Sequence, residues 1–256
     1  MSATAGTTAG DIAGAAVGPV DVWVIPTDQP PAVVRWLRGL LDPAELARAD
    51  AAHDPVQGAR FTVARGAVRL LVSARLGIDA GRLAWRHGPH GKPEPVHPSD
   101  SALASDPSSA PVLQVNWSGS GALAVLAVAE GRRVGVDVEE LRPPGVGARI
   151  ARRHFPPTDA ALVLEAPTEA EGAEHFTRLW CRREAVVKVH GGRLAQGLGL
   201  ALAGPSPLRL PDAGPLGSGP LWLADVPVPG PYRAAVAADL DLPVTVRQHV
   251  WCAPEL

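Results

Sequence analysis

Lysine is scarce in this chain of 256 residues. Of its 24 basic residues, only Lys92 and Lys188 are lysines, and all the others are arginines. Because arginine meets almost every other need for positive charge, a lysine indicates a place that needs a compact, rotatable ammonium group. Both lysines are therefore candidates for a functional site.

Cysteine is also scarce. Cys181 and Cys252 are not spaced as metal ligands or as a CxxC pair, and two cysteines in so long a chain make no disulfide framework. A reducing cytoplasm is therefore the expected location. The first 19 residues lack lysine and arginine and contain Asp11 and several glycines. For them we expect a disordered tail rather than a signal sequence.

The chain has no excess of positive charge, since its formal net charge is −2. There is no overall basic field for nucleic acid and no polybasic segment for a membrane surface, so we expect neither partner. The length and the 46% content of hydrophobic residues are enough to fill one large domain or two of ordinary size.

Hydrophobic patterns predict a mixed α+β protein. Strands are expected at residues 20–25, 83–86, 112–115, 122–129, 134–139, 221–226, 232–237 and 244–251. Helices are expected at residues 31–40, 43–52, 56–76, 146–154, 157–165 and 173–190. Residues 116–121 are a predicted loop, and a turn at residues 130–132 is predicted to join strands 122–129 and 134–139 as a hairpin. A Ser-, Ala- and Pro-rich stretch at 99–111 predicts a linker between an N-terminal half, 20–111, and a C-terminal half, 112–256.

Two acids share one face of the strand expected at residues 134–139. The valines of this strand alternate with Gly135, Asp137 and Glu139, so the two carboxylates point the same way. Their Cα atoms would lie roughly 7 Å apart, at a rise of about 3.3 Å per residue, which is close enough to share one hard cation. A half-solvated strand would show the same alternation without binding a metal.

The helix expected at residues 173–190 carries Glu184 and Lys188 four residues apart, beside its apolar stripe. They could form a simple surface ion pair. Arg183, however, lies near the middle of the apolar stripe, where a charge is costly unless an anion meets it, so this edge is a candidate ligand site. The arginines of the helix at 56–76 are expected mostly at the surface, with Arg60 favoured to reach a phosphate.

Three carboxylates with several cations and no histidine or cysteine favour Mg²⁺ and a pyrophosphate. The chemistry they indicate is transfer of a phosphoryl-type group.

Four motifs together resemble the 4'-phosphopantetheinyl transferase superfamily, in the long pseudodimeric form that activates polyketide and nonribosomal peptide synthases. They are the segments at residues 91–93 (Gly-Lys-Pro), 116–121 (Asn-Trp-Ser-Gly-Ser-Gly), 135–139 (Gly-Val-Asp-Val-Glu) and 180–188 (Trp-Cys-Arg-Arg-Glu-Ala-Val-Val-Lys). Together they cover roughly residues 48–200. The resemblance implies two similar α/β halves, each a small antiparallel sheet packed on a long helix, with coenzyme A in the cleft between them.

The resemblance also implies roles for single residues. The metal, Mg²⁺ or Mn²⁺, would be held by Asp137, Glu139 and Glu184. Catalysis would depend on Glu184, Lys188 and Asp137, with Glu184 as the usual candidate for general base, directly or through a water. Coenzyme A would be bound by Arg48, Arg60, Lys92, Pro93, Ser118, Gly119, Arg183 and Lys188.

The implied reaction transfers 4'-phosphopantetheine from coenzyme A to a serine of an apo acyl or peptidyl carrier protein and releases 3',5'-ADP. The enzyme is expected to be a monomer. Carrier proteins are generally acidic around this serine, so a local basic surface should receive them, with Arg149, Arg152, Arg153 and Arg178 as candidates.

This chain departs from the family pattern at Gly119, where family members usually carry a histidine that contacts the 3'-phosphate of coenzyme A. The glycine-rich stretch after Lys188 is also altered, to Gly191-Gly192-Arg193-Leu194. His87 or His90 could replace the missing imidazole, or Arg60 and Lys92 could suffice without it. An alternative function is a non-catalytic module that binds coenzyme A or a carrier protein.

Overall fold

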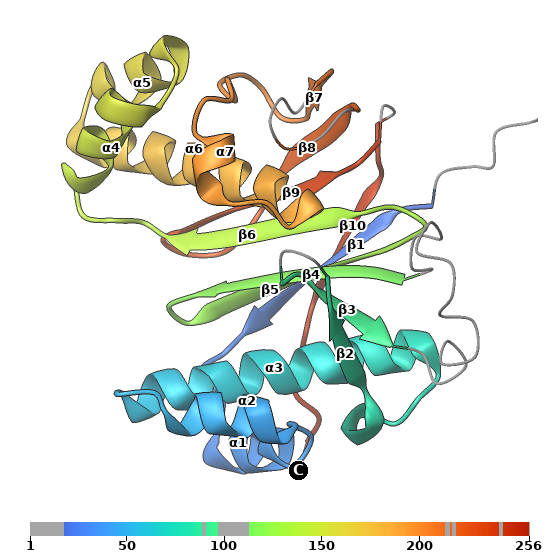
Figure 1. Ribbon diagram of the computed structural model, residues 1–256. Helices are drawn as coiled ribbons and strands as arrows, with labels where there is room; N and C mark the ends of the chain where they lie inside the picture. Colours follow the sequence, from blue (N-terminus) through green and yellow to red (C-terminus); the bar gives the residue numbers. More distant parts are fainter. Residues whose placement is uncertain are drawn as a thin grey trace, which may run out of the picture.

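The computed structural model describes residues 18–88, 91–96, 113–212, 216, 219–240 and 243–255. Figure 1 shows four layers, in which two sheets lie face to face between two groups of helices. The expected tail falls almost entirely, and the linker at 99–111 entirely, outside the described residues. No described helix is both long enough and apolar enough to span a membrane.

The first sheet has the strand order β10-β1-β5-β4, from β10 (Val246–Val250), β1 (Val20–Pro26), β5 (Leu123–Glu130) and β4 (Leu113–Ser120). The helix α3 (Pro55–Leu76) covers its outer face, with α1 (Pro31–Arg38) and α2 (Pro43–Asp50) beyond it. Asp54 caps the N-terminus of α3, and Gly77 ends the helix in the left-handed conformation, at φ 66°. A short hairpin of β2 (Ala84–His87) and β3 (Pro93–Val96) follows the 3₁₀ turn η1 (Ala80–Arg82).

The second sheet has the order β6-β9-β8-β7 and is antiparallel throughout. Its strands are β6 (Val134–Glu140), β9 (Tyr232–Ala238), β8 (Leu221–Val226) and β7 (Leu208–Leu210). The long α6 (Glu169–His190) covers it, and α4 (Val146–His154), α5 (Pro157–Leu164) and α7 (Leu194–Gly197) lie around α6. The expected α+β class, with a small sheet on a long helix in each half, is confirmed, although the first sheet is not antiparallel throughout because β1 and β10 pair in parallel.

Three clusters of buried residues hold these layers together. One lies between α3 and the first sheet, one between α6 and the second sheet, and the third between the two sheets. Val134, Val136 and Val138 belong to the cluster between the sheets. The apolar face of β6 therefore packs on the first half, as the valine alternation requires.

The predicted hairpin of residues 122–129 with 134–139 is wrong. β5 pairs with β1 and β4, whereas β6 pairs with β9 in the other sheet. Leu123 to Ala129 are all buried, as in a central strand, but such a pattern does not say which neighbours the strand has. The expected division at residues 111 and 112 therefore does not separate the two sheets, because β4 and β5 belong to the first sheet. The first half of the structure is the first sheet with α1, α2, α3 and the β2–β3 hairpin, and the second half is the second sheet with α4, α5, α6 and α7.

The C-terminal strand β10 returns from the second half and pairs with β1 in parallel. Asp21 of β1 is 2% exposed and holds this strand in place. Burial raises the pKa of Asp21, but hydrogen bonds from Arg247, Arg75 and His249 outweigh burial and lower this pKa to about 2. One buried carboxylate thus ties β1 to α3 and to the C-terminal strand.

Candidate active site

Strand β6 and helix α6 cross in direct backbone contact at Gly135. A Cβ atom on this residue would lie 2.1 Å from the carbonyl oxygen of Ala185 and 2.6 Å from the amide nitrogen of Val189. Only glycine allows this approach. The close crossing brings the polar face of β6 against the part of α6 that carries Glu184 and Lys188, so the motifs at residues 135–139 and 180–188 meet.

Asp137 is 2% exposed and lies at the centre of a small polar group. Its Oδ1 accepts hydrogen bonds from Lys188 Nζ at 2.6 Å and from Ser118 Oγ at 2.7 Å, and Lys188 Nζ also lies 3.1 Å from Ser118 Oγ. Its Oδ2 is buried and has no hydrogen-bond partner within the described part of the chain. A buried carboxylate oxygen without a partner is costly, so this atom is suited to a ligand.

Burial and the charges of Asp137 and Lys188 act on both Glu139 and Glu184. Burial, together with the charge of Asp137, raises the pKa of Glu139. Burial also raises the pKa of Glu184, against the opposing effect of Lys188, and Asp137 and Glu139 raise it further. Across the described residues, however, no three acidic, histidine or cysteine side chains gather into a formed metal site. The three acids influence one another without converging.

Strand β4 connects this acidic group to the first half. The expected loop at residues 116–121 is wrong, because Asn116 to Ser120 continue the strand. Asn116 Oδ1 accepts from the Val136 amide at 2.8 Å, and Ser120 Oγ donates to Glu139 at 3.0 Å. Every second side chain of β4, from Asn116 through Ser118 to Ser120, therefore bonds to β6. Sequence reasoning missed Asn116 and Ser120, although their spacing with Ser118 indicates one shared face.

A cleft of about 780 Å³ opens on the first-half side of β4. Five of the predicted coenzyme A residues line it, namely Arg48, Arg60, Pro93, Ser118 and Gly119. Arg60 pairs with Asp28 at 2.7 Å, and Arg48 lies over the ring of Phe61.

Gly119 leaves space in this cleft. A Cβ atom there would meet nothing closer than the Cβ of Ala124, at 3.6 Å, which is ordinary contact. The backbone at Gly119 therefore does not exclude the first atom of a side chain. His87 lines the same cleft, whereas His90 lies outside the described residues.

The chain is similar to known proteins over most of its length. The 4'-phosphopantetheinyl transferase HetI of Nostoc sp. is 32% identical over 196 residues, which make up 76% of this chain and 78% of HetI. A putative 4'-phosphopantetheinyl transferase of Synechocystis sp. is 30% identical over 196 residues, 75% of this chain and 74% of that protein. This chain belongs to the 4'-phosphopantetheinyl transferase superfamily.

The superfamily's sequence model matches residues 133–213 of this transferase, which contain β6 and α6. The 4'-phosphopantetheinyl transferase psf-1 of Bacillus pumilus is 36% identical over 107 residues, 40% of this chain and 44% of that protein. The protein is thus an enzyme, and the matched segment is the one that carries its acidic group.

Arg183 does not lie where a phosphate contact requires. Its side chain is fully buried, pairs with the fully buried Asp159 at 2.6 Å and lies over the ring of Phe155. It also donates to the carbonyls of Leu179 and Leu200. The costly charge in the apolar stripe is met by an anion from the protein itself, and the expected phosphate contact of Arg183 is wrong.

Lys92 also differs from expectation. Gly91 and Pro93 line the cleft of this transferase, but Lys92 is not among the described residues that do. Its ammonium instead donates to two backbone carbonyls of the second half.

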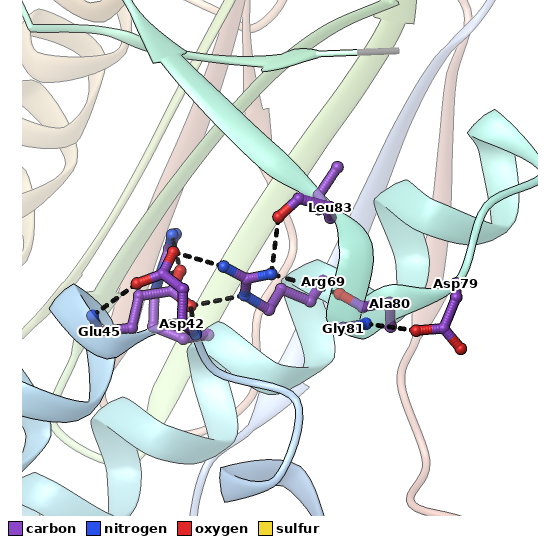
Figure 2. A network of polar contacts seen from close by, with 8 residues as sticks. Asp42, Glu45, Arg69, Asp79, Ala80, Gly81 and Leu83 are labelled. Atoms are coloured by element: carbon purple, nitrogen blue, oxygen red, sulfur yellow. Dashed lines mark hydrogen bonds and ion pairs between the residues drawn. The ribbon is translucent and has the colours of Figure 1, made fainter. Parts of the chain in front are cut away.

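The wall of the cleft rests on a buried ionic network that sequence reasoning missed. Arg69 is fully buried and donates to both Asp42 and Glu45 of the α2 N-terminus and to the Leu83 carbonyl, as Figure 2 shows. Arg65 is also buried, bonds to Glu45, and lies 4.1 Å from the ring centroid of Trp117. The expectation that these helix arginines are mostly exposed is therefore wrong. Asp42 and Glu45 form a capping box, a signal visible in the sequence, but their bonds to α3 are not.

Proposed function

We propose that this transferase moves 4'-phosphopantetheine from coenzyme A to a serine of an apo carrier protein. The serine Oγ forms a bond to the β-phosphorus of coenzyme A, and the bond from that phosphorus to the bridging pyrophosphate oxygen breaks. 3',5'-ADP leaves with the bond electrons, and the serine proton passes to a base. The observation that carries this proposal is Ser118, which lines the cleft and also donates to Asp137, so the donor cleft adjoins the acidic group.

The chemistry of the side chains around Asp137 suits a divalent metal, although the three acids would have to move together to bind one. The buried Asp137 Oδ2 lacks a partner in the described residues. The pKa values of Glu139 and Glu184 are raised, so a nearby positive charge would stabilise both ionised carboxylates. Three oxygen donors without sulfur or nitrogen suit Mg²⁺ or Mn²⁺. Asp137, Glu139 and Glu184 would hold it. When bound, such an ion supplies positive charge to the pyrophosphate.

The remaining roles belong to the protein's own groups. Lys188, already 2.6 Å from Asp137 Oδ1, is the ammonium that would stabilise charge on the leaving pyrophosphate. Glu184 is the proposed base, directly or through a water, and the water is the easier route because a carboxylate that binds a divalent metal is a weakened base. Arg48 and Arg60 would bind the phosphates of the adenosine end, with Arg60 exchanging Asp28 for a phosphate.

The proposed acceptors are acyl or peptidyl carrier domains of polyketide and nonribosomal peptide synthases. Arg149, Arg152 and Arg153 are exposed on α4 and can receive an acidic partner. Arg178, the fourth candidate, is only half-exposed on α6 and has a buried Nε. We infer a monomer acting in the cytoplasm, where the two cysteines stay free thiols.

Intact-mass analysis tests this function directly. The enzyme is incubated with coenzyme A, Mg²⁺ and several apo carriers, and the carrier is expected to gain the mass of phosphopantetheine. Asp137→Ala should abolish this gain while remaining folded, and EDTA should abolish it in the wild type. Glu140→Gln is the matched control, because Glu140 is an exposed acid at the end of the same strand.

Two outcomes would contradict the proposal. Full activity of Asp137→Ala in EDTA would exclude the metal site. Tight binding of coenzyme A without modification of any carrier would instead favour the non-catalytic module.

A further inference from the structure

Lys92 joins the two halves of the molecule through backbone acceptors. Its Nζ donates to the carbonyl oxygen of Val134 at 2.8 Å and to that of Val189 at 3.0 Å. Val134 begins β6, and Val189 lies in the last turn of α6. One side chain of the first half therefore contacts both elements that carry the proposed catalytic residues.

The end of α6 needs such a donor. The last carbonyls of a helix have no partner within the helix, and their partial negative charge favours a cation. The amides of Gly191 and Gly192 bond to the carbonyls of Lys188 and Val187. The Val189 carbonyl is bonded by Lys92 instead. The ammonium thus completes the C-terminal cap of α6 from the other half of the protein.

The backbone on both sides of the Lys92 side chain is fixed by local contacts. Gly91 has a φ of 80°, which favours glycine, and the Gly88 amide donates to the Lys92 carbonyl at 3.0 Å. Gly91 and Pro93 line the cleft, whereas the residue between them bonds to β6 and α6. Consecutive residues therefore form the cleft wall and the contact to the catalytic half.

The surroundings of Lys92 are mixed in charge. Burial lowers the pKa of Lys92 to about 8, and Asp239 and Glu94 oppose this effect while Arg133 adds to it. His190, at the end of α6, has its own pKa lowered by burial, Arg133 and Lys92. No carboxylate among the described residues forms an ion pair with the Lys92 ammonium, so its bonds to the two carbonyls are its direct contacts.

We propose that Lys92 is a positioning residue, which holds the cleft wall at Gly91 and Pro93 in register with β6 and α6. This proposal rests on the proposed function, because it concerns the alignment of the bound donor with Asp137 and Lys188. It differs from the role that the family resemblance implies, in which this lysine contacts coenzyme A. Loss of Lys92 should therefore slow the chemical step and leave binding of the 3'-phosphate unchanged.

The test separates kcat from KM. Lys92→Met is assayed with coenzyme A and with 3'-dephospho-coenzyme A, at saturating apo carrier. We expect kcat to fall about tenfold or more, since small misplacements of reacting groups cost up to about a hundredfold. The KM for coenzyme A should stay within about threefold, a change worth well under 1.4 kcal/mol. The preference for coenzyme A over its dephospho analogue should be unchanged.

The control variant is Arg86→Met, which removes a cation from the same hairpin. Arg86 is exposed and pairs with Glu94 within the hairpin, so it does not join the halves. It should leave kcat and both KM values at wild-type levels. If Lys92→Met is insoluble, Lys92→Arg carries the same test, with a smaller fall in kcat.

Hydrogen exchange supplies a readout independent of activity. In Lys92→Met, the amides of the last turn of α6 should exchange faster than in the wild type. A raised KM for coenzyme A with lost preference over the dephospho analogue would overturn the proposal and make Lys92 a phosphate ligand. Wild-type kcat in a folded variant would also overturn it. A wild type that modifies no carrier would instead disprove the proposed function.

Discussion

Replacing Arg183 by methionine should destabilise the protein and leave donor binding intact. The substitution removes the ion-pair partner of Asp159, and both side chains are fully buried. Asp159 keeps the amides of Leu202 and Ala203 as donors, at 2.9 and 3.0 Å, but loses its only counter-charge among the described residues. Breaking a buried pair on one side costs about 3 to 5 kcal/mol, a large part of the roughly 5 to 15 kcal/mol that stabilise a typical domain.

Urea unfolding measures the free energy of unfolding of this variant, and steady-state kinetics at a temperature where it is folded measure its KM for coenzyme A. The double variant Arg183→Met/Asp159→Asn should recover part of the lost stability, because it removes the uncompensated charge. Arg48→Met is the matched control. It should raise the KM for coenzyme A without affecting stability, because Arg48 is exposed in the cleft. An Arg183→Met variant of wild-type stability with a tenfold higher KM would refute the burial argument and restore a phosphate contact.

Three further predictions concern other parts of the molecule. Gly119→His should lower the KM for coenzyme A roughly ten- to a hundredfold, which is the effect of one charge-assisted hydrogen bond, and should strengthen discrimination against 3'-dephospho-coenzyme A. An unchanged preference between coenzyme A and 3'-dephospho-coenzyme A would contradict this prediction. Asp21 should contribute about 2 kcal/mol of stability above pH 3.8, because its folded-state pKa is depressed to about 2, and this contribution should be lost as pH falls through that window. The free energy of unfolding of Asp21→Asn should not fall in this pH window. A variant whose stability falls with pH as steeply as that of the wild type would contradict this prediction. Charge reversal on α4 should raise the KM for the carrier and flatten its salt response, unless docking uses another surface than Arg149, Arg152 and Arg153.

Elements with strong local signals can be predicted from the amino-acid sequence alone. The valine alternation predicts β6 and the shared face of its acids, because burial of one strand face imposes a period of two. The apolar stripe and Gly191 predict the C-terminal part of α6 and its end. Strand β3, with two prolines in four residues, was missed, because proline argues against a strand.

Which groups meet depends on how the whole chain folds. β5 pairs with β1, about a hundred residues earlier in the chain, rather than with the adjacent β6, and the apolar pattern of a strand does not say which neighbour it pairs with. The buried Arg183 meets Asp159, 24 residues away, whereas the sequence shows only that some anion is needed. Lys92 likewise bonds to carbonyls 42 and 97 residues distant, and backbone acceptors carry no mark in the sequence. Local periodicity records burial, but the identity of a buried group's partner depends on contacts between distant segments, which form only in the folded chain.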